Sequence, residues 1–343
     1  MKHLNIQYYN EVESIINDWI KTYNVSKLSY FCSFEWHKVV LSFLKKAALT
    51  KRLLKIQYFT VQNDKNQVIV VGFFFINRYG TNKRLEFSHI LGPSDYYDFV
   101  YSENDITLNA VKEIISTIRK DFNATSVSIS MIKECSSIAK YLSQDSTVLK
   151  TELPAVAIHL EKNYEEYLQS LSKSVKQNIR TAYNRLKRDE LDYKLTILDR
   201  NDIPSIDFNK LKELYTLRNS FRKEKHNWKV KTFQALNNGF SGPADMFDLN
   251  ELKQTDFTLG LLEFKNEVAA YFFGFERNGK IEINRVVIND AFKFYSPGMI
   301  LFNEYIKIAF EQNLKVLDLT NGDEKYKFDL GGKMHNVYNA TIL

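Results

Sequence analysis

A two-residue turn, Asn278-Gly279, constrains the fold of this chain more than any other feature. Three apolar runs follow one another closely, at 257–264, 267–277 and 280–289. An Asn-Gly pair between two such runs is the strongest short hairpin signal in a sequence. The first two runs are separated only by Lys265-Asn266. We therefore expect a three-stranded antiparallel meander.

A loop, a helix (299–312) and a further strand (314–319) follow the meander. In an α/β sheet, a glycine turn that leads into a helix points unpaired backbone N–H groups and the positive helix end beyond the strand. Pro297 and Gly298 permit a tight approach there, and Ser296 is the expected N-cap. The pattern favours a phosphate-binding corner, although many structural helices begin in the same way.

The rest of the chain repeats one theme, helices, then antiparallel strands, then a helix and a strand. The N-terminal half has a helix from Ser33, strand candidates at 53–62 and 67–76, a helix at 106–122 and a strand at 126–130. The C-terminal half has a strand at 155–160 and helices at 163–171, 173–189, 209–224 and 230–238 before the meander. We expect an α/β fold of two related units, 1–150 and 151–343, each a mostly antiparallel mixed sheet flanked by helices.

Composition bounds the class of protein. Aromatic residues form 14% of 343 residues, which is ample for two cores, and the two cysteines, Cys32 and Cys135, form no metal or disulfide motif. We expect a cytoplasmic protein, because the N-terminus lacks a signal pattern and the longest apolar block, 68–76, is far shorter than the roughly 20 residues of a membrane span. The net charge of +6 favours phosphate-bearing partners without requiring DNA.

Absent motifs narrow the chemistry further. The chain has no G-x-S-x-G, H-E-x-x-H, Walker loop or Rossmann fingerprint, and its six histidines are scattered. Hydrolase, metalloenzyme, kinase and dehydrogenase readings therefore have no anchoring motif, and we expect no metal.

The segment "INRVVIND…YSPGMILFNEYIKIAFEQNLKVLDLTNGDEKYKFDLGG" resembles the core of GNAT acyltransferases. Its Y-S-P-G-x-x-L and D-x-x-x-G-x-x-x-Y-K patterns are similar to the CelD-type, BioF2-like, FemAB-like branch, and "SFEWHK", "GPSDYYDFV" and "LSKSVKQNIRTAYNRLKR" agree with it. The resemblance spans nearly the whole chain. It implies two tandem GNAT-like units, of which the second holds the donor site.

In that family, the strand before the loop carries the acyl donor and the loop and helix hold the diphosphate of coenzyme A. The resemblance thus implies acyl-CoA as co-substrate, bound by Val287, Ile288, Tyr295, Ser296, Gly298 and Asn321. Only Gly298 remains of the usual glycine-rich diphosphate loop, so fewer N–H groups can converge there.

Acyl transfer to an amine needs a base, an oxyanion donor and a proton for the thiolate. Asp318 ends a strand, the usual place for functional groups in an open sheet, and is either the base or the cap of a turn. Lys327 matches the lysine that the related FemABX pattern places near the transferred carbonyl, and it is either an oxyanion donor or a surface lysine. Tyr326, expected in a strand, is either the thiolate's proton donor or a packed side chain.

Other polar side chains are candidates for acceptor binding. Arg285 shares its strand face with apolar residues, so it either binds an anion or pairs with a carboxylate. The basic helix 173–189 either binds an anionic partner or is a solvated charged face. Two further clusters could line an acceptor cleft, namely Arg218, Arg222 and Trp228, and Asp95, Tyr96 and Asp98 after a Gly-Pro turn.

Taken together, these patterns predict an N-acyltransferase that moves an acyl group, most plausibly acetyl, from acyl-CoA to an amine on a nucleotide-linked amino sugar for surface polysaccharide synthesis. One alternative is a FemABX-like aminoacyltransferase that uses aminoacyl-tRNA and a peptidoglycan precursor, although the chain lacks the sustained heptads of that family's coiled-coil arm. A second alternative is a non-catalytic module that binds a polyanion through the basic helix.

Overall fold

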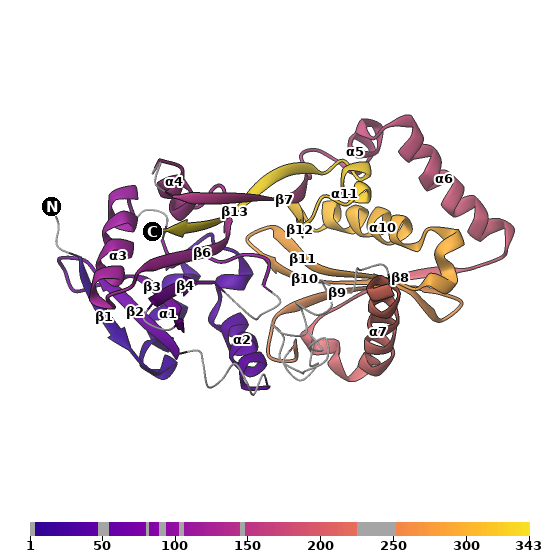
Figure 1. Ribbon diagram of the computed structural model, residues 1–343. Helices are drawn as coiled ribbons and strands as arrows, with labels where there is room; N and C mark the ends of the chain where they lie inside the picture. Colours follow the sequence, from indigo (N-terminus) through magenta and orange to yellow (C-terminus); the bar gives the residue numbers. More distant parts are fainter. Residues whose placement is uncertain are drawn as a thin grey trace. The chain divides into compact units, whose positions relative to one another are not determined.

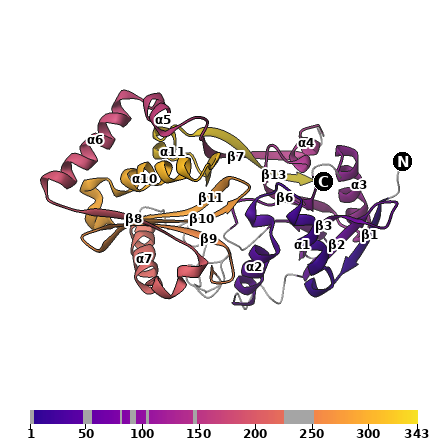
Figure 2. The same cartoon turned by 180° about the vertical axis from the view of Figure 1, so that it is seen from behind.

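The computed structural model describes residues 4–46, 55–79, 82–88, 94–102, 106–144, 148–224 and 252–343. The chain forms two compact units (Figures 1 and 2). Unit 1 comprises Met1–Pro154 together with His335–Leu343, and unit 2 comprises Ala155–Met334. Each unit is an α/β layer structure with its own set of strands in a mixed sheet and its own apolar core.

Unit 1 contains most of the N-terminal elements. They are β1 (Asn5–Tyr9), α1 (Ile16–Asn24), α2 (Phe34–Lys46), β2 (Lys55–Gln62), β3 (Val68–Tyr79), β4 (Asn82–Phe87), β5 (Val100–Tyr101), α3 (Leu108–Asp121), β6 (Ser126–Lys133) and α4 (Ser137–Gln144). The strand β7 (Leu149–His159) then leads into unit 2. In the main core of unit 1, aromatic side chains of β2 and β3, such as Phe59 and Phe74, pack against the apolar stripe of α3.

Unit 2 begins with the second half of β7. Its other elements are α5 (Tyr164–Ser170), α6 (Lys173–Arg188), β8 (Tyr193–Leu198), η4 (Arg200–Ser205), α7 (Phe208–Glu224), β9 (Phe257–Phe264), β10 (Glu267–Arg277), β11 (Lys280–Ile288), η5 (Asp290–Tyr295), α10 (Pro297–Glu311), β12 (Val316–Asn321) and α11 (Lys325–Asp329). The last strand, β13 (Lys333–Ile342), returns to unit 1. In Figure 1, α10 and α7 lie on opposite faces of strands β9 to β11.

The two sheets have the same strand plan. In unit 1 the order is β1-β2-β3-β4-β6-β13, and in unit 2 it is β8-β9-β10-β11-β12-β7. In both, four antiparallel strands are followed by one parallel pair, β4 with β6 or β11 with β12. A helix, α3 or α10, connects the strands of each parallel pair, as a crossover requires. The units are therefore structural repeats.

In each unit, the strand at one end of the strand order comes from a distant part of the chain. It follows directly after the last helix of the other unit. After α4, the chain enters unit 2, where β7 pairs antiparallel with β12. After α11, it returns to unit 1, where β13 pairs antiparallel with β6. The two units have thus exchanged their closing strands.

The meander that opened our sequence analysis is confirmed. β9, β10 and β11 pair antiparallel in order. Both connecting pairs adopt left-handed backbone at both residues, with φ of 48° and 66° at Lys265 and Asn266 and of 52° and 71° at Asn278 and Gly279. Two consecutive left-handed residues are the signature of the type I′ hairpin turn. The hairpin of β2 and β3 and the helix that follows Ser33 are confirmed as well, and the Ser33 hydroxyl accepts a hydrogen bond from Trp36 N.

Several elements differ from the sequence-based expectation. β1, β4, β8 and β13 were not expected. Tyr326 was expected in a strand but lies, like Lys327, in the short helix α11, which begins after Glu324. The helix predicted at 230–238 lies outside the described residues. Among the helices that are described, none is long and apolar enough to cross a membrane.

Candidate active site

The parallel strands β11 and β12 separate soon after they meet. They pair over only three positions, the last of which joins Glu282 to Asp318, although β11 continues to Ile288 and β12 to Asn321. Two bulges cause this separation. Asn284 is an extra residue in β11 relative to β10, and β12 has one extra residue relative to β7 between Asp318 and Asn321. An opening thus begins at the carboxyl ends of the paired segments.

Hydrogen bonds fix the bulge in β12. Thr320 has left-handed backbone, with φ of 54°, which is costly for a β-branched residue. Its N–H donates to Asp318 Oδ1 (2.9 Å), and its hydroxyl donates to the carbonyl of Ile283 in β11 (3.0 Å). The Thr320 hydroxyl is therefore a link between the two strands where they diverge.

The far part of β11 turns one backbone edge toward this opening. Asn289 N donates to Ala269 O of β10 (2.9 Å), so in an antiparallel ladder the backbone N–H and C=O of Val287 also face β10. The N–H and C=O groups of Val286 and Ile288 point the other way. The guanidinium of Arg218, from α7, donates to the carbonyl of Val286, which agrees with this orientation. Of our two expected donor contacts on this strand, Val287 turns its backbone groups toward β10 and Ile288 turns its own toward the opening.

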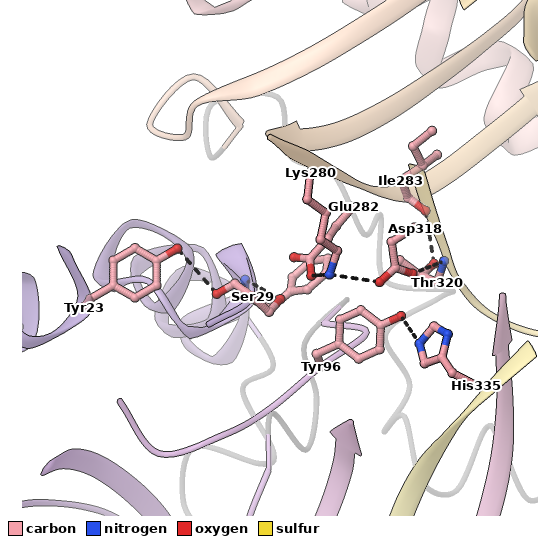
Figure 3. Close-up of polar contacts among 10 residues, drawn as sticks. Tyr23, Ser29, Tyr96, Lys280, Glu282, Ile283, Asp318, Thr320 and His335 are labelled. Carbon is pink, nitrogen blue, oxygen red and sulfur yellow. Dashed lines mark hydrogen bonds and ion pairs between the residues drawn. The ribbon is translucent and has the colours of Figure 1, made fainter. Parts of the chain in front are cut away.

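A charged cluster lies where the opening begins (Figure 3). Lys280 Nζ is 2.6 Å from Glu282 Oε1 and 3.0 Å from Asp318 Oδ2. Both carboxylates are almost fully buried, at 3% and 1% exposure. The neighbouring Ile281 and Leu317 join the core beneath α10, so these charges lie on the α7 face of the sheet. Asp318 therefore both holds the bulge and pairs with a lysine.

Lys327 is buried and supports the end of β12. Its ammonium donates to the carbonyls of Thr320 (3.3 Å), Asn321 (2.6 Å) and Gly322 (3.2 Å), and it lies 3.0 Å from Glu324 Oε2. The side chain is not the surface lysine of the alternative interpretation. Stabilising an oxyanion would require its ammonium to leave these carbonyls, so its place in the fold is that of a positioning residue.

The start of α10 differs from our expectation. Ser296 is the N-cap residue, as predicted, but it has left-handed conformation, with φ of 53°, and its hydroxyl makes no capping hydrogen bond. The Ser296 carbonyl instead accepts from Met299 N and Ile300 N. A Cβ at Gly298 would lie 2.8 Å from Ile288 Cδ1, so this glycine lets α10 approach β11 closely.

The structure also places the remaining predicted donor-site residues. Tyr295 donates from its hydroxyl to Asp189 Oδ2 (3.0 Å) at the end of α6, and this hydrogen bond raises its pKa. Tyr326 is half-buried, and its ring stacks on Phe302 of α10 with centroids 5.9 Å apart. Asn321 ends β12 beside the opening.

Arg285 lies on the α7 face of the sheet. Its guanidinium stands over the ring of Tyr215, 4.1 Å from the centroid, and the arginine is only 8% exposed. Burial lowers the pKa of Arg285 to about 10, and the positive charge of Arg218 contributes to that shift. The structure thus brings together two of the predicted acceptor residues, Arg285 and Arg218. The Arg222 side chain and Trp228 lie outside the described residues.

The predicted acceptor residues of unit 1 are less exposed than we expected. Tyr96 is 1% exposed, with Lys133 Nζ 3.8 Å from its ring centroid and His335 Nε2 3.5 Å from its hydroxyl (Figure 3). Asp98 is buried and accepts a hydrogen bond from Phe99 N (2.8 Å). Asp95 is half-buried.

Sequence reasoning missed Lys280, Glu282, Thr320 and Tyr215. Lys280 and Glu282 are two residues apart in a strand, so their common face could have been read from the alternation. Their juxtaposition with Asp318 depends on the register of β11 and β12, for which the sequence carries no local signal.

Comparison with known proteins tests the assignment. Residues 173–328 match the family model for the acetyltransferase (GNAT) domain. This range contains the meander, the opening, α10 and Lys327. Unit 2, which contains this range, therefore carries a GNAT-type domain. Unit 2 is accordingly an acyltransferase domain.

Three solved structures share the fold of the entire chain. A conserved protein of unknown function from Bacteroides thetaiotaomicron aligns with a TM-score of 0.56 and 14% identity over 99% of this chain and 100% of that one. FemX aligns with a TM-score of 0.56 and 11% identity over 98% and 97%. The C-terminal DUF2156 domain of a putative lysylphosphatidylglycerol synthetase from Agrobacterium fabrum gives 0.55 and 9% over 96% and 92%. No curated protein matches the chain.

Proposed function

We propose that unit 2 transfers an acyl group from acyl-CoA to an amine, and that the donor lies in the opening between β11 and β12. The observation that carries this proposal is the edge of β11 at Val286 and Ile288, along which no strand of the described residues pairs, although Arg218 donates to the Val286 carbonyl. The pantetheine arm of coenzyme A contains two amide groups, and an amide-bearing chain can add to an open strand edge as a further strand would. The diphosphate would then lie at the start of α10, near Tyr295 and Gly298, where the helix end is positive.

The charged cluster would serve the acceptor. The carboxylates of Glu282 and Asp318 attract an ammonium group, and each takes one of its protons. The first proton leaves to give a neutral amine that attacks the thioester carbon, and the second leaves the nitrogen once the C–N bond has formed. The new C–N bond gives a tetrahedral intermediate, whose oxyanion is stabilised by N–H groups on the edge of β11. Breakage of the C–S bond releases coenzyme A thiolate, which Tyr326 of α11 protonates. Lys327 acts indirectly, by holding the end of β12.

For the acceptor we propose an amine on a nucleotide-linked amino sugar. Arg218 and Arg285 support this proposal, because their two cationic side chains could bind a phosphate of the nucleotide. The second candidate is transfer of an aminoacyl group from aminoacyl-tRNA to a peptidoglycan precursor. The polar side of α6 favours it, because Lys173, Arg180, Lys187 and Arg188 are exposed there, while Val175, Ile179 and Leu186 are buried.

Acetyl-CoA should stabilise the protein against heat. At one hundred times Kd, a ligand that binds only the folded state contributes about 2.7 kcal/mol, which calorimetry or thermal scanning detects. Release of free thiol in the presence of amino-sugar nucleotides then reports transfer. Stabilisation by aminoacyl-tRNA that weakens steeply with salt, with none by acyl-CoA, would support the second candidate instead.

A proline at position 286 tests the donor edge directly. Val286→Pro removes an N–H that faces the opening, not one that pairs with β10, so the sheet should tolerate it as an edge position. We expect acetyl-CoA to bind about tenfold more weakly, because the variant loses one hydrogen bond to the donor and the proline ring adds bulk at the edge. The measurement is a calorimetric titration.

Val286→Ala is the matched control, since it shortens the same side chain and keeps the N–H. Equal donor affinities in the two variants would contradict the proposed binding mode.

A further inference from the structure

Unit 1 contains an opening of its own at the position that corresponds to the one in unit 2. The parallel strands β4 and β6 pair from Arg84–Ser126 to Phe87–Ile129, where β4 ends, whereas β6 continues to Lys133. A cavity of about 270 Å³ lies there, with walls from both strands and from residues 94–97. This cavity belongs to unit 1 alone and plays no part in the transfer proposed for unit 2.

A bulge like the one in β12 of unit 2 occurs in β6 of unit 1. β6 has an extra residue relative to β13, between Ile129 and Ile132, and Met131 has left-handed backbone with φ of 64°. Met131 N donates to the side chain of Asn339 (2.9 Å), and Met131 O accepts from Tyr97 N (2.8 Å). Both backbone groups of Met131 are therefore bonded to partners outside β4, so β6 makes no further pair with β4 beyond Ile129.

The two faces of the β4–β6 pair have opposite character. Leu85, Phe87, Val127 and Ile129 are fully buried in the core beneath α3. Arg84, Glu86 and Ser128 alternate with them and line the cavity. Ser88, Ser94 and Ser130 add three more hydroxyl groups. An apolar core would not select four serines and two charges at one place.

The charges in the wall have unused hydrogen-bonding capacity. Arg84 Nε lies 3.5 Å from Glu86 Oε1, which is close enough for ion pairing, but it is buried and makes no hydrogen bond within the described residues. The Glu86 side chain is only 15% exposed. A buried guanidinium nitrogen without a hydrogen bond is unusual unless a ligand or water supplies the acceptor.

The remaining walls are held rigidly. The indole N–H of the fully buried Trp36 donates to Ser94 Oγ (2.5 Å), and the Tyr97 hydroxyl donates to Phe73 O (2.8 Å). Because these side chains are already fixed, a ligand would meet a cavity that is formed before it binds, which lowers the entropic cost of binding.

We propose that this cavity binds a small polyhydroxylated molecule of the monosaccharide class. Serine hydroxyls both donate and accept hydrogen bonds, Glu86 accepts from two hydroxyls at once, and Arg84 Nε donates to a ring or hydroxyl oxygen. The volume is slightly below the roughly 300 Å³ at which drug-sized sites begin, so it fits one sugar ring and not a nucleotide.

The test measures binding of glucose, glucosamine, N-acetylglucosamine and inositol at millimolar concentration. Saturation-transfer NMR and calorimetry detect the binding, and no acyl donor is present. We expect at least one probe to bind. Glu86→Gln, which keeps the shape of the side chain, should weaken that binding about tenfold or more, and Ser128→Ala about three- to tenfold.

Ser126→Ala is the matched control, because Ser126 lies on the same strand and face, opposite Arg84, but outside the cavity. It should bind as the unaltered chain does, and so should Val286→Pro, whose change is in unit 2. Melting temperatures establish that each variant is folded. The proposal is overturned if no probe binds the unaltered chain, or if Glu86→Gln and Ser128→Ala, both folded, bind as tightly as Ser126→Ala.

Discussion

Replacement of Lys327 by methionine is expected to lower the free energy of unfolding by about 2 to 4 kcal/mol. The methionine fills the same space but leaves the carbonyls of Thr320, Asn321 and Gly322 without their common donor. Glu324 also loses this ion pair, although its half-exposed carboxylate remains hydrated. The end of β12 should loosen, and acetyl-CoA affinity should fall with it. Urea unfolding and calorimetric titration measure the two effects.

The same helix provides the control. Lys325→Met removes an equal charge two residues away, where the lysine is 85% exposed and pairs with Asp329. Such surface pairs contribute little, so a change below about 0.5 kcal/mol is expected. If the two substitutions destabilise the protein equally, Lys327 does not hold β12 in the way that its contacts indicate.

Asp98→Asn should change how stability depends on pH. Burial raises the pKa of Asp98 to about 7, against the hydrogen bonds from Phe99 N, Ser136 and Tyr101. In the unfolded chain this carboxyl titrates near its ordinary value of about 4. Between pH 4 and 7 the folded state therefore keeps a proton that the unfolded state has lost, and stability falls as the pH rises. The full difference corresponds to about 4 kcal/mol as an upper bound.

Asparagine at this position has no carboxyl to ionise, so the fall should vanish. We expect the variant to gain stability relative to the unaltered chain as the pH rises from 5 to 8, by about 2 kcal/mol or more. Urea unfolding at a series of pH values measures this difference. Asp64→Asn, on the exposed β2–β3 loop, controls for removal of one negative charge. A difference between Asp98→Asn and the unaltered chain that stays flat across this range would contradict an uncharged Asp98 in the folded state.

The sequence predicted those parts of the fold that local chemistry determines. Asn278-Gly279 specified a turn because both residues tolerate left-handed backbone, and the register of β10 and β11 follows from that turn. Ser33 and the apolar stripe after it likewise specified where α2 begins.

Parts determined by distant contacts were missed. β13 alternates only weakly and is largely polar, and its partner β6 lies about 200 residues earlier. Ser296 is the N-cap of α10, but its hydroxyl does not cap the helix. The chain leaves η5 through this left-handed residue, which turns its carbonyl and not its hydroxyl toward the helix.

The candidate site divides in the same way. Asp318, Arg218 and Arg285 were found from residue type and position, and the structure brings them to the strands that border one opening. The opening itself results from bulges at Asn284 and near Thr320, which depend on pairing with β10 and β7. Lys327 was found by resemblance, but its hydrogen bonds to three carbonyls follow from the path of the folded backbone.

The exchange of closing strands delays the folding of unit 1 during translation, because β13 is made last. When Pro154 leaves the ribosome, β6 still lacks the neighbour that His335–Leu343 will supply about 180 residues later. At translation rates of 5 to 20 residues per second, that wait lasts roughly 10 to 40 s. During this interval an unpaired β edge is open to nascent chains on neighbouring ribosomes, so the first half of the molecule cannot mature until the second half is made.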